Sequence, residues 1–358
     1  MVMDTDTNLT SDLDQLRALV DNAKLPLELQ EKISGMLDRL MRSVKYGGYS
    51  EEFERTKHYL DWVRQIPWTT HSADAIDLHT AQEVLNKHHH GLQDVKERIL
   101  EYLAVIKLNQ QTEGFKAARA PILLLVGLVG TGKTTFAYAL AEAMGRKVAR
   151  IPFGGMGSAR DLRGQSRLHL ESEPGYVVKA LSRAGTMNPI ILLDEIDRVA
   201  EAARTDIMGV LVELLDPEQN SQFTDHFIDY PLDLSQVIFI GTANNTAHIA
   251  TAVMDRMEPL AMPSYTDEEK IAIARTYLLP KALKETALPE HVLRIDEDLW
   301  PQIVRPLGYD SGIRTLQRTI QGIVRKTAKQ FVQKEINTVF LDSNNIKAYL
   351  PSYKTELI

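Results

Sequence analysis

The segment from Pro121 to Thr135 constrains the fold more than any other part of the chain. Residues 122–126 read Ile-Leu-Leu-Leu-Val, which is typical of a buried strand, and residues 127–134 fit the pattern G-x-x-x-x-G-K-[ST]. A helical spacing of apolar residues begins directly after that pattern. A phosphate-binding loop requires this order of strand, glycine-rich loop and helix. The segment therefore predicts a nucleoside triphosphate site; the alternative is a glycine-rich turn that matches by chance.

Each residue type in this loop has a physical role in holding phosphate. Glycine lets backbone N–H groups turn inward around phosphate oxygens without a clash from a Cβ atom. The helix N-terminus adds partial positive charge, the Lys133 side chain can reach the β- and γ-phosphates, and the Thr134 hydroxyl can bind Mg²⁺. The residues predicted to bind the nucleotide are Gly127, Gly130, Thr131, Gly132, Lys133, Thr134 and Thr135.

Composition excludes several classes of protein. The 358 residues are 44% hydrophobic and 25% charged, as in ordinary globular proteins, and include no cysteine for disulfides or thiolate metal sites. No apolar run approaches the about 20 residues that span a bilayer, and the acidic N-terminus is no secretory signal, so a cytoplasmic protein is expected. The net charge of −7 argues against binding of nucleic acid over the whole protein surface. A local basic patch that binds DNA weakly is still an open alternative.

From Pro121 onward, apolar runs alternate with helical patterns. Strands separated by helices predict a parallel sheet with crossover helices, which is an α/β fold. The strand candidates are residues 122–126, 147–153, 190–193, 237–241 and 259–262.

The chain is mainly helical on either side of this core. After Pro263, Thr266 and Glu269 form a predicted capping box, and residues 313–332 form a predicted amphipathic helix. The predicted organisation is an N-terminal helical segment (1–75), an α/β nucleotide-binding domain (76–263) and a small helical domain (264–358).

Polar side chains follow two of the predicted strands. The run 190–193 leads into Asp194 and Glu195, and the run 237–241 leads toward Asn244. Ligands of parallel sheets bind beyond the carboxyl ends of the strands, so both groups are expected to face the phosphate loop. There Asp194 would hold Mg²⁺, Glu195 would orient or deprotonate the attacking water, and Asn244 would contact the γ-phosphate or that water. The alternatives are solvated acids at a strand end and an ordinary turn asparagine.

Two later arginines, Arg256 and Arg314, stand before the last predicted strand and at the start of the long helix. Most arginines are solvated surface charges, and spacing alone does not single these out. They matter because a cation that completes a phosphoryl-transfer site in trans is worth about 10³–10⁵ in rate.

The ordered set of motifs from the phosphate loop to Arg314 resembles an AAA+ ATPase. Four longer stretches make the resemblance more specific, and a fifth matches the helical segment that precedes this ATPase. Together they resemble the ATPase part of the Lon protease family, and the resemblance covers nearly the whole chain. The stretches are residues 90–105, 193–197, 215–220 (Leu-Asp-Pro-Glu-Gln-Asn), 254–258 and 50–68.

The resemblance implies a role for each candidate residue. ATP and Mg²⁺ would be the cofactors, with metal held by Thr134 and Asp194 and water activated by Glu195. Asn244 would be the first sensor, Arg256 the arginine finger that reaches a neighbouring subunit, and Arg314 the second sensor. A finger acting in trans implies a ring, by family a homohexamer, that acts on unfolded or damaged polypeptides.

Two segments depart from the family pattern. The phosphate loop carries Leu128 and Val129 where the family usually has two prolines. In the segment that matches the substrate-gripping pore loop, His169 stands at the aromatic position and Leu170 at the aliphatic one. An ordinary surface loop is the alternative there. The histidine run 88–90 is interpreted as a solvated turn rather than a metal site.

The family cuts peptides with a Ser–Lys domain, and no such site is expected within this chain. Two hypotheses follow. The first is a Lon-type ATPase that hydrolyses ATP to unfold and translocate polypeptide, feeding ATP-dependent proteolysis. The second is a stand-alone ATPase that acts as a nucleotide-dependent scaffold or a DNA-associated regulator with a weakened pore loop.

Overall fold

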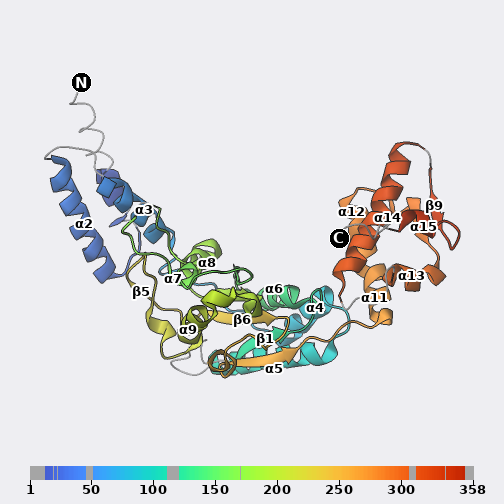
Figure 1. Ribbon diagram of the computed structural model, residues 1–358, viewed down its shortest axis with the longest axis horizontal. Helices are drawn as coiled ribbons and strands as arrows, with labels where there is room; N and C mark the ends of the chain where they lie inside the picture. Colours follow the sequence, from blue (N-terminus) through green and yellow to red (C-terminus); the bar gives the residue numbers. More distant parts are fainter. Residues whose placement is uncertain are drawn as a thin grey trace. The chain divides into compact units, whose positions relative to one another are not determined.

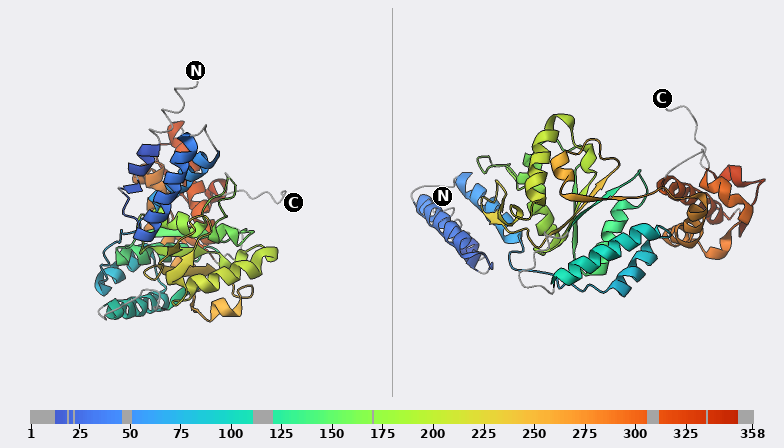
Figure 2. Two further views of the ribbon diagram at one scale, coloured as in Figure 1. Left: turned by 90° about the vertical axis from the view of Figure 1, so that its left-hand side faces the viewer. Right: turned by 90° about the horizontal axis from the view of Figure 1, so that it is seen from below.

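The computed structural model describes residues 13–18, 20–21, 23–45, 51–110, 121–169, 171–305, 312–334 and 336–350. This part of the chain forms two compact units (Figures 1 and 2). The first unit contains the N-terminal helices and most of the α/β core. The second contains residues 86–95, the loop 127–133 and the chain from Ala261 onward. The three-part division of the chain stays a prediction.

A five-stranded sheet with the order β2-β3-β6-β1-β7 forms the α/β core. Strand β6 pairs in parallel with β1 and β3, and β3 pairs in parallel with β2. All five predicted strands are confirmed, and each end lies within two residues of its expected position. The strands are β1 (Ile122–Val126), β2 (Val148–Pro152), β3 (Ile190–Asp194), β6 (Ile238–Ala243) and β7 (Met257–Ala261).

Helices flank this sheet, which explains the continuous apolar runs of its central strands. Every residue of β3 and β6 is buried. A strand that is covered on both faces has no solvent side, so its sequence does not alternate between apolar and polar residues. The flanking helices are α5 (Gln93–Gln110), α6 (Lys133–Met144), α8 (Tyr176–Ala184) and α9 (Arg204–Leu215).

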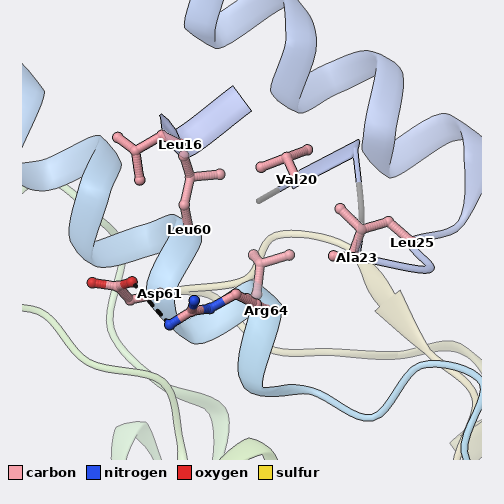
Figure 3. Close-up of a pocket in the computed structure, with 8 residues that line it drawn as sticks. Leu16, Val20, Ala23, Leu25, Leu60, Asp61 and Arg64 are labelled. Atoms are coloured by element: carbon pink, nitrogen blue, oxygen red, sulfur yellow. Dashed lines mark ion pairs between the residues drawn. The ribbon is translucent and has the colours of Figure 1, made fainter. Parts of the chain in front are cut away.

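The N-terminal helices are α2 (Leu27–Lys45), α3 (Glu51–Gln65) and α4 (Leu78–His88). Apolar side chains of α2 and α3 belong to the same hydrophobic core as the sheet. A small apolar pocket lies beside α3, with the ion pair Asp61–Arg64 at 3.7 Å on its wall (Figure 3). None of the predicted site residues lines this pocket.

Short elements complete the first unit around the edges of the sheet. They are helices α7 (Arg160–Arg163) and α10 (Thr251–Met254), the hairpin strands β4 (Phe223–Thr224) and β5 (Pro231–Leu232), and 3₁₀ turns at 196–198, 201–203 and 220–222. The hairpin was not predicted, because each of its strands is only two residues long.

The second unit is mostly helical and has its own core around Trp300 and Ile303. The capping box is confirmed: the Thr266 hydroxyl accepts from the Glu269 N–H, and the Glu269 carboxylate accepts from the Thr266 N–H. The elements are α11 (Asp267–Ile273), a π-helical turn (Ala274–Leu278), α12 (Leu279–Glu285), β8 (Leu293–Ile295), α13 (Trp300–Val304), α14 (Arg314–Val332), β9 (Val339–Leu341) and α15 (Ile346–Tyr349), with 3₁₀ turns at 290–292 and 297–299.

The expectation of a solvated turn at the histidine run is wrong for His89, which is 4% exposed. Gly91 and Leu92, which follow soon after α4, both have positive φ, and the histidine that precedes them is buried rather than solvated. Within the described residues, no group of three or more His, Cys, Asp or Glu side chains is placed to hold a metal ion.

Candidate active site

The phosphate loop follows β1 directly and is folded around its own lysine. The Lys133 Nζ donates to the carbonyl oxygens of Gly127 at 2.6 Å and Leu128 at 3.0 Å. Gly130 and Gly132 have φ values of 86° and 94°, in the left-handed region that glycine adopts without strain. The Lys133 ammonium group is therefore held inside the loop by backbone carbonyls. The backbone of this loop is the part of the chain that is predicted to surround phosphate.

The same loop lies against the start of α14 within the second unit. The Ile313 N–H donates to the Gly130 carbonyl at 3.1 Å. A Cβ atom on Gly312 would overlap the carbonyl oxygen of Val129, so the backbones approach at a distance that only glycine permits. Arg314, the predicted second sensor, is the first residue of α14. The structure thus brings the backbone next to Arg314 into contact with the phosphate loop.

Thr134 and Thr135 stand in the first turn of α6, directly after Lys133. The Thr134 side chain is partly buried and that of Thr135 is exposed. Thr131 is fully buried, and its hydroxyl donates to the Leu128 carbonyl at 2.9 Å. Thr131 therefore shapes the loop from inside.

The buried carboxylate of Asp194 ends β3 and has a partner from each neighbouring strand. Its Oδ1 accepts a hydrogen bond from the Thr242 hydroxyl of β6 at 2.5 Å. Its Oδ2 pairs with the Arg150 Nε of β2 at 2.6 Å. Asp194 is 5% exposed and Thr242 is fully buried. The two contacts fix the carboxylate at the carboxyl edge of the sheet.

Glu195 follows at the first position beyond the strand, with φ 59° in the left-handed region. A residue other than glycine adopts this conformation at a cost of about 1–2 kcal/mol, and such strain clusters at functional sites. The Glu195 N–H donates to the Thr242 hydroxyl at 2.9 Å. One hydroxyl therefore links the predicted metal carboxylate to the backbone of the predicted base.

Asn244 lies just beyond β6, where Asp197 holds its backbone. The Asp197 Oδ2 accepts from the N–H groups of Asn244 at 3.1 Å and Asn245 at 3.4 Å. Asp197 is 7% exposed. It therefore ties the turn after β3 to the turn after β6, the two places where the predicted catalytic side chains stand.

Arg256 stands between α10 and β7 in the first unit. Its Nη2 pairs with the Asp216 Oδ2 at 2.9 Å, and its Nη1 donates to the Ala252 carbonyl at 2.7 Å. The guanidinium is therefore held by contacts within the first compact unit of the same chain.

The predicted pore-loop segment forms a turn with an exposed apolar tip. Leu168 is 73% exposed and His169 is also exposed, whereas Leu170 lies outside the described residues. The guanidinium of Arg167 stacks over the ring of Tyr59 in α3, with its carbon 4.1 Å from the ring centroid. Leu168 is thus an exposed apolar side chain that the sequence analysis did not single out.

Helix α3 also contacts this segment at Leu168 and again four residues further on. The Arg55 Nη1 donates to the Leu168 carbonyl at 3.2 Å, and the His58 Nε2 lies 3.2 Å from the Ser172 carbonyl. The segment is therefore attached to α3 at two points along its length.

The base of the same loop is closed by the buried carboxylate of Asp225. It accepts from the N–H groups of Gly175, Phe227 and Ile228 at 2.7, 2.8 and 3.1 Å. Burial raises the pKa of Asp225 to about 6, although these hydrogen bonds act in the opposite direction. Gly164, with φ 76°, stands beside the carboxylate with no room for a side chain.

Comparison with known proteins identifies two domains in this chain. Residues 123–263 match the model of the ATPase family associated with various cellular activities, and residues 284–339 match that of the Lon protease AAA+ ATPase lid domain. The Lon protease of Lawsonia intracellularis is 39% identical over 339 residues, which are 95% of this chain and 40% of that protein. The chain belongs to the Lon-type AAA+ ATPases.

Other Lon proteases show the same extent of similarity. That of Desulforamulus reducens is 41% identical over 94% of this chain and 40% of its own length. That of Clostridioides difficile is 37% identical over 96% of this chain and 43% of its own length. The chain thus spans about two fifths of these relatives. None of the helices that the structure describes has the length and apolar character needed to cross a bilayer.

Three residues beside the candidate site were given no role by sequence reasoning, although Asp197 lies in one of the stretches that carry the resemblance: Arg150, Asp197 and Thr242. Each acts on a residue in another strand or turn, so its partner is not visible from local spacing. The sequence did offer one indication of the role of Thr242, because a hydroxyl within a fully buried strand requires a hydrogen-bond partner. Arg150 left a weaker one, as a charged residue inside a strand of the core.

We expect Thr242→Val to lower ATP turnover and to raise the Mg²⁺ concentration needed for half-maximal turnover. Valine keeps the shape but leaves Asp194 and the Glu195 N–H without the hydroxyl, which also costs about 1–3 kcal/mol of unfolding free energy. Thr242→Ser, which keeps the hydroxyl, is the control. Turnover measured across Mg²⁺ concentrations checks the prediction, and equal activity of the two variants would contradict it.

Proposed function

We propose that this chain is the motor of a Lon-type machine, which hydrolyses ATP to unfold and translocate polypeptides. The observation that carries the proposal is the Thr242 hydroxyl, which contacts both Asp194 and the Glu195 backbone. This contact fixes the Asp194 carboxylate, which suits a metal, beside the backbone of Glu195, whose carboxylate suits a water molecule. Phosphoryl transfer needs little more from the protein than such positioning together with electrostatic stabilisation.

The side chains present suit ATP and Mg²⁺. A threonine hydroxyl and a carboxylate are hard oxygen ligands, so Thr134 and Asp194 would hold Mg²⁺ together with phosphate oxygens. The bound Mg²⁺ would neutralise charge on the β- and γ-phosphates, which Lys133 would also contact. Glu195 would take a proton from the attacking water, and Asn244 would orient that water.

Two arginines would complete the nucleotide site. Arg314 would report on the nucleotide from the lid, since its helix begins at the phosphate loop. Arg256 would reach the nucleotide of a neighbouring chain, which implies a ring, and by family a homohexamer. A charged finger of this kind supplies about 10³–10⁵ in rate.

Unfolded or damaged polypeptides would be the substrates. The loop that carries Leu168 and His169 supports this, because it offers an exposed apolar side chain on a well-anchored turn. The relatives are Lon proteases, and we propose that translocated chains pass to a Ser–Lys peptidase in the complete machine.

The proposal predicts that ATP turnover per chain rises with chain concentration, as rings form, and rises again when an unfolded polypeptide is added. Reduced, alkylated protein is the probe, and its folded parent is the matched control. Lys133→Ala gives the background rate. Turnover that stays at this background at every concentration, with and without the probe, would contradict the proposal.

A further inference from the structure

The Leu-Asp-Pro-Glu-Gln-Asn motif at 215–220 has no role in the hydrolysis described above. In the structure, α9 ends at Leu215 and Asp216 organises the turn that follows. The Asp216 Oδ1 accepts from the Glu218 N–H at 2.9 Å, and Oδ2 accepts from the Gln219 Nε2 at 3.2 Å. The Asp216 carbonyl accepts from the N–H groups of Gln219 at 3.1 Å and Asn220 at 2.9 Å. One aspartate therefore sets the geometry of the whole motif.

The same carboxylate also holds Arg256, which lies 40 residues further along the chain. The Nη2–Oδ2 distance is 2.9 Å, and the arginine side chain is 29% exposed. The hydrogen bond from Arg256 is the main reason that the pKa of Asp216 lies below its usual value. The Ala252 carbonyl of α10 accepts from Nη1, so the guanidinium is fixed at two of its nitrogens.

We propose that Asp216 is the positioning residue for Arg256, which it orients toward the nucleotide of the neighbouring subunit. This inference rests on the trans-acting role of Arg256 given under the proposed function. A guanidinium has five N–H donors, and the two contacts use two of them. The remaining donors can meet phosphate oxygens. A long side chain that is already oriented loses less conformational freedom when it binds.

The test is Asp216→Asn, compared with Glu218→Gln in the same turn. The Glu218 side chain is exposed, and only its backbone N–H contacts Asp216. We expect Asp216→Asn to lower kcat by about tenfold or more, which is a part of the about 10³–10⁵-fold that a complete arginine finger supplies, while the KM for ATP stays unchanged. Thermal unfolding and ring size should match the unaltered chain. An increase in kcat, or equal loss in both variants, would overturn the inference.

Mixed rings separate positioning from a structural effect. Asp216→Asn chains keep their own Glu195, and Glu195→Gln chains keep a correctly held finger. In a mixed ring, the intact site of one chain receives the intact finger of the other. Turnover of the mixture should therefore exceed that of either variant alone, up to the level reached by mixing Arg256→Ala with Glu195→Gln.

The two proposals fail in different ways. If the Arg256→Ala mixture recovers turnover and the Asp216→Asn mixture does not, the positioning role of Asp216 is wrong and the finger stands. If neither mixture recovers turnover, Arg256 does not act in trans, and both proposals are overturned.

Discussion

Glu195→Gln is expected to lower kcat for ATP hydrolysis by about 10²–10⁴-fold, the usual contribution of a general base. Glutamine has the same shape but cannot accept a proton from water. The backbone that carries it would not change, because the Glu195 N–H contact to Thr242 involves no side-chain atom of residue 195. ATP affinity should therefore stay close to that of the unaltered chain. Single-turnover hydrolysis and equilibrium nucleotide binding measure the two quantities separately.

Glu201→Gln is the matched control, since Glu201 is an exposed glutamate in the 3₁₀ turn that soon follows. It should hydrolyse ATP at the normal rate. If Glu195→Gln retains most of its turnover, water is activated by another group. If it loses ATP binding as well, Glu195 holds the nucleotide site together rather than acting as a base.

Gly175→Ala is expected to lower the free energy of unfolding by about 3 kcal/mol or more. A Cβ atom at this position would overlap the Leu162 carbonyl and lie 2.6 Å from the Gly164 nitrogen. Both neighbours are backbone atoms, so no side chain can rotate away. The Gly175 N–H also donates to the buried Asp225, and any shift of the backbone would weaken that hydrogen bond.

Gly209→Ala provides a comparison, because this substitution is expected to change the free energy of unfolding in the opposite direction. Gly209 is exposed in the middle of α9 and has no atom within 4 Å of the added methyl group. Alanine there should raise the free energy of unfolding by about 0.5–1 kcal/mol, because it loses less backbone freedom. Urea denaturation of both variants measures the difference. Equal stability of Gly175→Ala and the unaltered chain would show that the loop base is not tightly packed.

Local patterns were sufficient to predict the five strands of the main sheet and the cap of one helix, but not every element of the fold. The apolar run before the phosphate loop predicted β1 with its observed ends, and the Thr266–Glu269 spacing predicted the cap of α11. Both depend on interactions within a few residues, which a single sequence displays. The π-helical turn at 274–278 was not predicted, since its pattern continues that of the flanking helices. Strand β8 was missed because it depends on pairing with β9, 46 residues away.

The candidate site was predictable to the same extent. Residues that stand at strand ends or in the glycine loop, such as Lys133 and Asp194, could be found from spacing. The groups that orient them could not, because Asp216 reaches Arg256 and Thr242 reaches Asp194 across 40 and 48 residues. The functional roles assigned to all the site residues stay predictions, including those of Lys133, Thr134, Asp194, Glu195, Asn244, Arg256 and Arg314.

The attachment of the Leu168 loop to α3 has a mechanical consequence. A force on the exposed tip would reach Arg55 through the Leu168 carbonyl, and His58 through the Ser172 carbonyl. Asp225 closes the base of the loop, so the turn cannot yield by opening there. In the proposed translocation, a force that a moving polypeptide exerts on the loop would therefore be shared with α3. This helix would then support the loop mechanically.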